Sequence, residues 1–69
     1  MELRMLRRGM SGNDCYAAMV LMKAHGYYDG TPDDVFGPKM EAGLREMQAE
    51  HGLGVDGILG NNSWTFLLK

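Results

Sequence analysis

The sequence has few of the residues on which many functional sites depend. Cys15 is the only cysteine among 69 residues, so no disulfide can form within the chain. We expect it to be a small buried apolar residue. The two histidines, His25 and His51, are too few for a zinc site, which needs three or four converging ligands, so we predict no metal and no cofactor. No apolar run has the length of a membrane span, and no signal peptide is recognised.

An excess of positive charge is also missing. Seven Lys and Arg against nine Asp and Glu give a net charge of −2, which argues against a nucleic-acid partner and an anionic membrane. A chain this short buries only about 60% of the surface that its unfolded form exposes. It has room for one thin core and little depth for an enclosed active site. We therefore predict a single domain over residues 1–69 that is not an enzyme.

The sequence does contain a short internal repeat. The string DDVFG at residues 33–37 returns 23 positions later as DGILG at residues 56–60. Each copy has an acidic residue, a small or turn-forming residue, two apolar residues and a glycine, and each precedes a segment that can begin a helix. Because a unit this short cannot bury its apolar face alone, we expect the two copies to pack against one another.

Three segments have the pattern of helices. They are predicted over about residues 14–25, 39–51 and 64–68. Asn13-Asp14 and Asn61-Asn62-Ser63 supply cap chemistry, Pro38 suits a first helical turn, and glycines follow the first two segments. Trp64 is expected to face the core. The predicted fold class is mainly α: a small three-helix domain with an internal pseudo-repeat and short extended loop segments.

Few residues in the sequence suggest a catalytic role. Asp33 and Asp56 are the candidate carboxylate pair, since paired carboxylates can cleave glycosidic bonds. Both sit in the repeated turns, however, where an aspartate side chain accepts backbone amides, and we favour that structural role. Cys15 lies on an apolar helix face and Ser63 is interpreted as a cap. No nucleophile with a base is recognised.

Taken in order, these residues resemble the peptidoglycan-binding domain of the small three-helix type. Such domains are appended to bacterial cell-wall hydrolases, spore-cortex enzymes and phage endolysins. The resemblance runs through LRRG at 6–9, GND at 12–14, GYY at 26–28, VFGPK at 35–39 and VDGILG at 55–60. It implies a non-catalytic module that binds bacterial cell-wall peptidoglycan, through its glycan or its stem peptide, at an extracellular or cell-wall location.

A peptidoglycan site needs aromatic faces beside fixed polar groups. Five residues could supply both: Tyr27, Tyr28, Gln48, Asn61 and Asn62. The alternative, in which Tyr27 packs in the core and the asparagines only cap a helix, stays open at this point. The resemblance favours binding.

The chain also departs from the usual residues of the family on its first two helices. The family usually has a large aliphatic residue, glutamine, threonine, alanine and phenylalanine at the positions of Ala18, Met19, Met40, Gly43 and Met47. Asp34 replaces a glycine of the repeat. Drift, repacking of the core and an added interface are three open explanations, for a natural or a redesigned member.

The added interface leads to an alternative function. Lys23 is the only charged residue between Cys15 and Ala24, so the first helix is apolar nearly all round. An exposed apolar patch marks an interface when it is large, and Met and aromatic residues suit such patches. The alternative is a protein-interaction module, engaging a partner protein or a second copy through Tyr16, Met19, Val20, Leu21 and Phe66.

Overall fold

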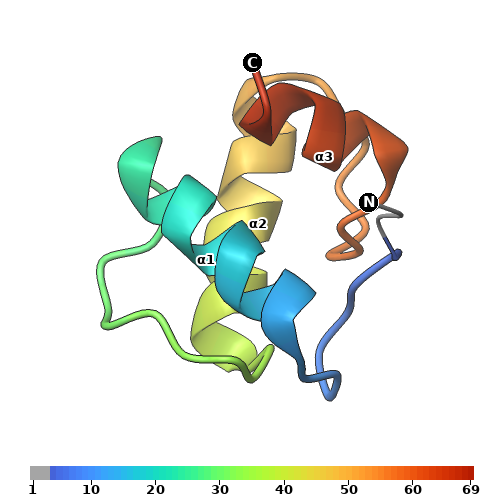
Figure 1. The fold of residues 1–69 in the computed structure, drawn as a ribbon. Coiled ribbons are helices and arrows are strands. Elements are labelled where there is room, and N and C mark those ends of the chain that lie inside the picture. Colours follow the sequence, from blue (N-terminus) through green and yellow to red (C-terminus); the bar gives the residue numbers. More distant parts are fainter. Residues whose placement is uncertain (1–3) are drawn as a thin grey trace.

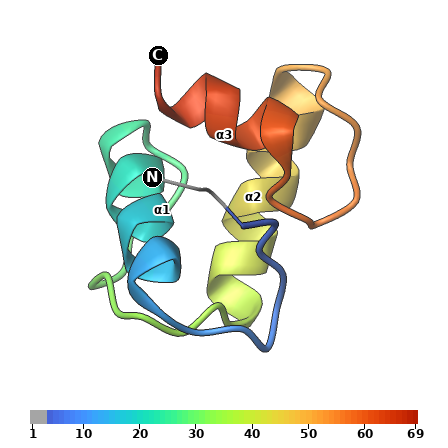
Figure 2. The ribbon, with the colours of Figure 1, turned by 45° about the vertical axis from the view of Figure 1, so that its right-hand side comes forward.

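The computed structural model describes residues 4–69 and leaves residues 1–3 outside the description. It contains α1 (Asn13–Ala24), α2 (Pro38–Glu50) and α3 (Asn61–Leu67). Figures 1 and 2 show α1 and α2 side by side, with the short α3 lying across one end of the pair. In the described part of the chain, extended segments form only isolated β-bridges. The predicted mainly-α, three-helix class is confirmed.

Both copies of the repeat pair with the N-terminal segment. Leu6 and Leu59 form an antiparallel bridge in which the Leu59 amide donates to the Leu6 carbonyl at 2.8 Å. Ser11 and Val35 form a second antiparallel bridge, beside which the Phe36 amide donates to the Met10 carbonyl at 2.9 Å. The copies therefore meet through this shared segment and, at Phe36 and Leu59, through a common core.

One core fills the space between the three helices and the repeat. Trp64 is 3% exposed, and its ring N–H donates to the carbonyl of Arg4 at 2.9 Å, so its predicted core position is confirmed. Methionines from two helices supply much of the remaining volume, a role that suits their flexible side chains. The buried apolar residues are Leu6, Cys15, Ala18, Met19, Met22, Phe36, Met40, Leu44, Met47, Leu59, Trp64 and Leu67. The departures at Ala18, Met19, Met40 and Met47 thus lie in the core.

Gly43 allows the chain after α1 to lie directly on α2. A Cβ atom at this position would stand 2.0 Å from the carbonyl oxygen of Tyr27. The Tyr27 amide in turn donates to the carbonyl of Met22 at 2.8 Å, just after Gly26 turns the backbone with a φ of +87°. The glycine inside the second helix therefore reflects a close approach of two backbones.

The helix starts differ from the predicted caps. Gly12, Gly37 and Gly60 are the N-cap residues, and none of the three helices has a side-chain cap hydrogen bond. The predicted cap positions are therefore wrong, although Asp14 Oδ1 does accept from the free amide of Cys15 at 3.0 Å. The α3 helix begins earlier than expected, at Asn61. Asp14 also accepts from Arg4, and the buried Ser63 lies against Gln48.

Candidate functional site

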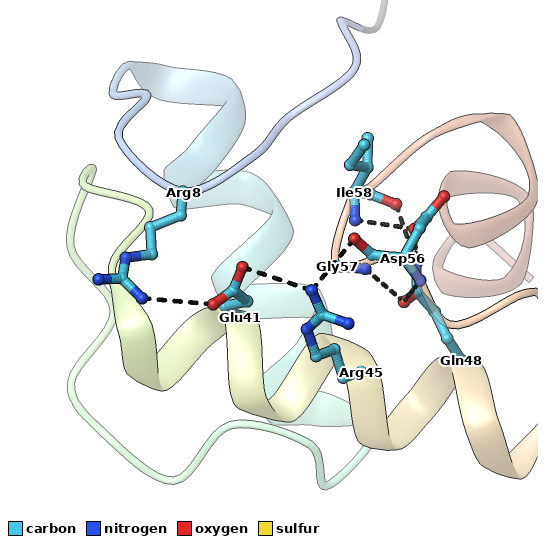
Figure 3. A network of polar contacts seen from close by, with 7 residues as sticks. All are labelled: Arg8, Glu41, Arg45, Gln48, Asp56, Gly57 and Ile58. Carbon is cyan, nitrogen blue, oxygen red and sulfur yellow. Dashed lines mark hydrogen bonds and ion pairs between the residues drawn. The ribbon is translucent and has the colours of Figure 1, made fainter.

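The turn of the second repeat copy is held by one buried side chain from α2. Gln48 is 1% exposed, and its amide nitrogen donates to Asp56 Oδ1 at 3.0 Å and to the Ile58 carbonyl at 2.9 Å. Its amide oxygen accepts from the backbone N–H groups of Asp56 at 3.3 Å and Gly57 at 3.1 Å (Figure 3). Asp56 Oδ1 also accepts from the Ile58 amide at 2.9 Å, so the predicted turn role of Asp56 is confirmed.

A chain of charged side chains links this turn to the N-terminal segment. Arg8 pairs with Glu41 at 3.4 Å, and Glu41 pairs with Arg45 at 3.9 Å. Figure 3 shows this chain of side chains. Arg45 also donates to the Asp56 carbonyl at 3.4 Å. Its guanidinium covers Gly57, where an added Cβ would stand 2.8 Å from Nη2. Exposed pairs of this kind add little stability, so their main effect is to position Arg45 on the turn.

The turn of the first copy has simpler support. Asp33 Oδ1 accepts from the Val35 amide at 3.0 Å, which confirms its predicted turn role. The amide of Asp33 faces the sulfur of Met19 at 3.4 Å. Among residues 4–69 a positive φ occurs only at glycines, so Asp34 does not take the left-handed conformation that Gly57 has, with its φ of +73°.

The predicted peptidoglycan-binding residues fall into two separate hollows. Tyr27 and Tyr28 line one of about 280 Å³, between the loop after α1 and the exposed side of α2. Asn61 and Asn62 line another of about 340 Å³, between the second repeat turn and the start of α3. Gln48 borders the second hollow, but its amide is bonded within the chain. The five residues therefore do not form a single site.

The first hollow is charged, and its tyrosines are already engaged. The Tyr27 hydroxyl donates to Glu50 at 2.8 Å, which raises the pKa of Tyr27, and lies 2.8 Å from Nε2 of His51. Lys39 Nζ stands 5.8 Å from the centre of the Tyr28 ring and 2.9 Å from Asp29. The hydrogen bond from Lys39 lowers the pKa of Asp29.

A third hollow, of about 290 Å³, lies beside the second one along α3. It is lined by His51, Leu53, Asn62, Thr65, Phe66 and Lys69. Leu53 and Asn62 line both hollows. No pattern in the sequence predicted a role in peptidoglycan binding for His51, Leu53 or Thr65, and only their positions in the fold bring them to one surface.

An aromatic cluster forms at the end of this surface, where the helices finish. Phe66 lies between two imidazoles, with ring centres 5.0 Å from His25 and 4.2 Å from His51. Tyr27 adds an edge-on contact to His51 at 6.0 Å. His25 and His51 are the C-cap residues of α1 and α2. Their position at helix ends was expected from the following glycines, whereas their contact with Phe66 was not.

The predicted protein-interaction face is smaller than expected. Tyr16 is 47% exposed and Val20 is 41% exposed, as that hypothesis requires. Met19 is 1% exposed and belongs to the core, so its predicted interface role is wrong. Leu21 and Phe66 are partly buried against the core. Of the five residues, only Tyr16 and Val20 are freely exposed. The α1 helix has few charged residues mainly because its other sides are buried against the core.

The remaining reactive side chains are buried or dispersed. Cys15 is fully buried, and this burial raises the pKa of its thiol. Over residues 4–69, no group of three or more His, Cys, Asp or Glu side chains is placed to hold a metal ion. None of the helices in this described range is long and apolar enough to cross a membrane.

Comparisons with known proteins agree with this architecture. Residues 11–67 match the family described as "Putative peptidoglycan binding domain". A spore cortex-lytic enzyme of Bacillus cereus is 36% identical over 66 residues, which cover 96% of this chain but only 26% of that enzyme.

Two solved structures are also similar. The crystal structure of the SleB N-terminal domain superposes with a TM-score of 0.92 and 34% identity, covering 97% of this chain and 92% of that one. A peptidoglycan-binding protein from Clostridioides difficile, in complex with glutamine hydroxamate, gives a TM-score of 0.87 and 33% identity over 93% of this chain and 40% of that one. With a family match that spans all three helices, this chain belongs to the peptidoglycan-binding domain family.

Proposed function

We propose that this chain is a non-catalytic module that binds bacterial peptidoglycan and so associates with the cell wall or the spore cortex. The observation that carries the proposal is the family match over residues 11–67, supported by the near-complete superposition on the SleB N-terminal domain. This chain spans about a quarter of the length of the relatives that are named spore cortex-lytic enzymes. We assign attachment to the wall, and no cleavage, to this part.

The chemistry of the described residues supports a binding role without catalysis. Asp33 and Asp56 each use a carboxylate oxygen inside their own turn. The Cys15 thiol is buried with a raised pKa, which disfavours the reactive thiolate. The Ser63 hydroxyl is buried beside Gln48. These groups serve the fold, and the surface hollows are lined mainly by groups suited to recognition.

Peptidoglycan offers two kinds of chemistry to such a module. Its sugars present hydroxyl and acetamido groups, while its stem peptides present carboxylates and amines. The exposed amides of Asn61 and Asn62 suit the sugars, and the charged hollow beside Tyr28 and Lys39 suits the peptide. The amide of Gln48 is already hydrogen-bonded within the chain, so this residue supports the surface around Asn61 and Asn62 and does not contact the ligand.

A pull-down on purified, protein-free cell-wall sacculi tests the proposal. The folded chain, verified by circular dichroism, is expected to sediment with the sacculi, while a folded control protein of similar size and net charge stays in solution. Equal recovery of the two proteins in the supernatant would count decisively against peptidoglycan binding.

The absence of catalysis is tested on the same material. Sacculi incubated with the chain are expected to release no more soluble muropeptide than sacculi incubated with buffer. Release that grows with time and with protein concentration would show that the module cleaves its ligand.

A further inference from the structure

We infer that peptidoglycan is held by its glycan strand, in a trough along the exposed face of α3. This inference rests on the proposed function and deepens it. The second and third hollows adjoin at Leu53 and Asn62, which line both, and we refer to the two together as the α3 trough. It extends from Asn61 at the start of α3 to Lys69 beyond its end. Figures 1 and 2 show this helix lying beside the end of α2 and the loop that follows it.

The helical repeat builds one wall of this α3 trough. Asn62, Thr65 and Phe66 are spaced as i, i+3 and i+4, which places them on one side of α3, and Lys69 lies beyond the end of this helix. The buried residues Ser63, Trp64 and Leu67 anchor α3 to the core. The facing wall comes from the end of α2 and the following loop, at His51 and Leu53. A depression that follows the full length of a helix suits a polymer better than a compact ligand.

The side chains in the α3 trough match the groups of a sugar polymer. The amides of Asn61 and Asn62 and the hydroxyl of Thr65 can both donate and accept hydrogen bonds, as sugar hydroxyl and acetamido groups require. Phe66 and His51 also line the trough, and because their rings lie against one another at 4.2 Å and 35° they give it an apolar aromatic wall. The combination of aromatic side chains with a few polar groups is typical of ligand sites.

Charge distinguishes the glycan from the stem peptide. The sugar backbone is uncharged where its lactyl groups are amide-linked to peptide, whereas the peptides carry carboxylates. The α3 trough has one negative side chain, Asp56, and one positive side chain, Lys69, so these two charges cancel. The chain as a whole carries a net charge of −2, which gives carboxylate-rich peptides no long-range attraction.

The hollow beside Tyr28 is a weaker place for the glycan. Its cation, Lys39, is already paired with Asp29 at 2.9 Å, and Glu46 also lines it. A neutral sugar entering there would have to compete with this ion pair without offering a charge in exchange. Lys39 nevertheless provides a control position, because its side chain is 61% exposed and it lies outside the α3 trough.

The experiment uses soluble glycan strands released from sacculi by an amidase, with the freed lactyl carboxylates converted to methylamides so that the strands are uncharged, and the released stem peptides are the second ligand. Affinities are measured by calorimetry for the wild type and for Asn62→Ala, Thr65→Arg and Lys39→Ala, each checked for folding by circular dichroism. We expect binding to the glycan strands. Asn62→Ala should weaken it about fivefold by removing one polar contact. Thr65→Arg should weaken it by at least about tenfold by filling the α3 trough, and Lys39→Ala should leave it within about twofold.

The outcomes separate the two proposals. Failure of the folded wild type to bind intact sacculi overturns the proposed function and this inference with it. Binding to sacculi or stem peptides without binding to glycan strands overturns this inference alone. The same conclusion follows if Lys39→Ala weakens glycan binding while Asn62→Ala and Thr65→Arg do not.

Discussion

The two copies of the repeat begin with the same turn, but α1 and α2 support these turns differently. In each copy the aspartate side chain accepts from the amide two residues later, at 3.0 Å for Asp33 and 2.9 Å for Asp56. The aspartate's own amide meets the sulfur of Met19 in the first copy and the amide oxygen of Gln48 in the second. A thioether is a weak acceptor, whereas a primary amide can both accept and donate.

The difference shows that the same turn motif can be held either by packing or by a polar network. In the first copy the turn rests on the core through the apolar Met19, and its contact with the helix is mostly packing. In the second copy a satisfied buried polar network fixes the turn, and such networks are rigid. The fixed turn includes Asp56 and Ile58, which also border the proposed glycan trough. The stiffer copy is therefore the one beside the candidate site.

The largest expected effect comes from giving the second copy the support of the first. Gln48→Met keeps the side-chain volume but leaves the amides of Asp56 and Gly57 without their acceptor. Each unsatisfied buried group costs about 1–3 kcal/mol. We expect a total loss of about 3 kcal/mol in the free energy of unfolding, measured by urea denaturation.

Gln48→Glu provides the matched control for this prediction. It retains an acceptor for the amides of Asp56 and Gly57, but when ionised it loses the donor to the Ile58 carbonyl and to Asp56 Oδ1, and it faces the Asp56 carboxylate. If Gln48→Met changed the stability by less than 1 kcal/mol, the buried network would not be what holds the second turn.

A second prediction concerns the contact of α2 with the loop that leads to the first copy. Gly43→Ala would gain about 1 kcal/mol of helix propensity. The added methyl, however, would stand 2.0 Å from the Tyr27 carbonyl oxygen and force the loop away from α2. Overpacking of this kind costs about 1–3 kcal/mol. We expect a net loss of about 1–2 kcal/mol in thermal or urea unfolding, since backbone has to move.

Ala42→Gly serves as the control for Gly43→Ala, because Ala42 is exposed on the same helix. It should lose about 1 kcal/mol through propensity alone. A Gly43→Ala variant more stable than the wild type would show that the close approach to Tyr27 is not required.

The sequence predicted the parts of this fold that depend on local pattern. The three helices, the turn roles of Asp33 and Asp56 and the buried Trp64 all follow from residue type and spacing. The caps were wrong because tertiary partners compete for the same polar groups. The Ser63 hydroxyl, for example, accepts from Gln48, fifteen residues earlier, which no local pattern reveals.

The candidate site was less accessible to prediction than the fold. Tyr28 and Asn62 are both exposed enough to bind a ligand, but only the folded arrangement shows that they line different hollows. Met19 was placed on a surface because helix α1 has so few charges, whereas its neighbours in space are core residues. The stacking of Phe66 between His25 and His51 likewise depends on where three helix ends meet.

A third prediction concerns the N-terminal segment that both copies share. Arg4 ties this segment to the first half through Asp14, with Nη2 2.8 Å from Oδ1, and to the second half through its carbonyl, which accepts from Trp64. Hydrogen bonding from Arg4 lowers the pKa of Asp14 in the folded chain. The resulting stabilisation is present above the ordinary pKa of an aspartate, about 3.9, and is lost as the pH falls through the lowered value.

We therefore expect Asp14→Asn to destabilise the chain at pH 7 and to matter progressively less as the pH falls below about 4. The effect should be smaller than that of Gly43→Ala, because Arg4 is half exposed to solvent. Urea denaturation of both proteins between pH 7 and pH 2 measures it. A stability difference that stays constant over this range would mean that the ion pair with Arg4 is not its cause.

The smallest expected effect comes from the reverse exchange, Met19→Gln, which gives the first copy the type of support found in the second. The new amide oxygen would face the Asp33 amide, where the sulfur now stands at 3.4 Å, and the new amide nitrogen would have the Asp33 carboxylate within the same turn. These bonds would offset the cost of burying an amide, so we expect a change of less than about 1 kcal/mol in urea unfolding. Met19→Leu, which removes the acceptor and keeps the volume, is its control. A loss above 2 kcal/mol for Met19→Gln would show that the two turns differ in shape as well as in chemistry, because the first, built on Asp34 in place of a left-handed glycine, could not accept the amide.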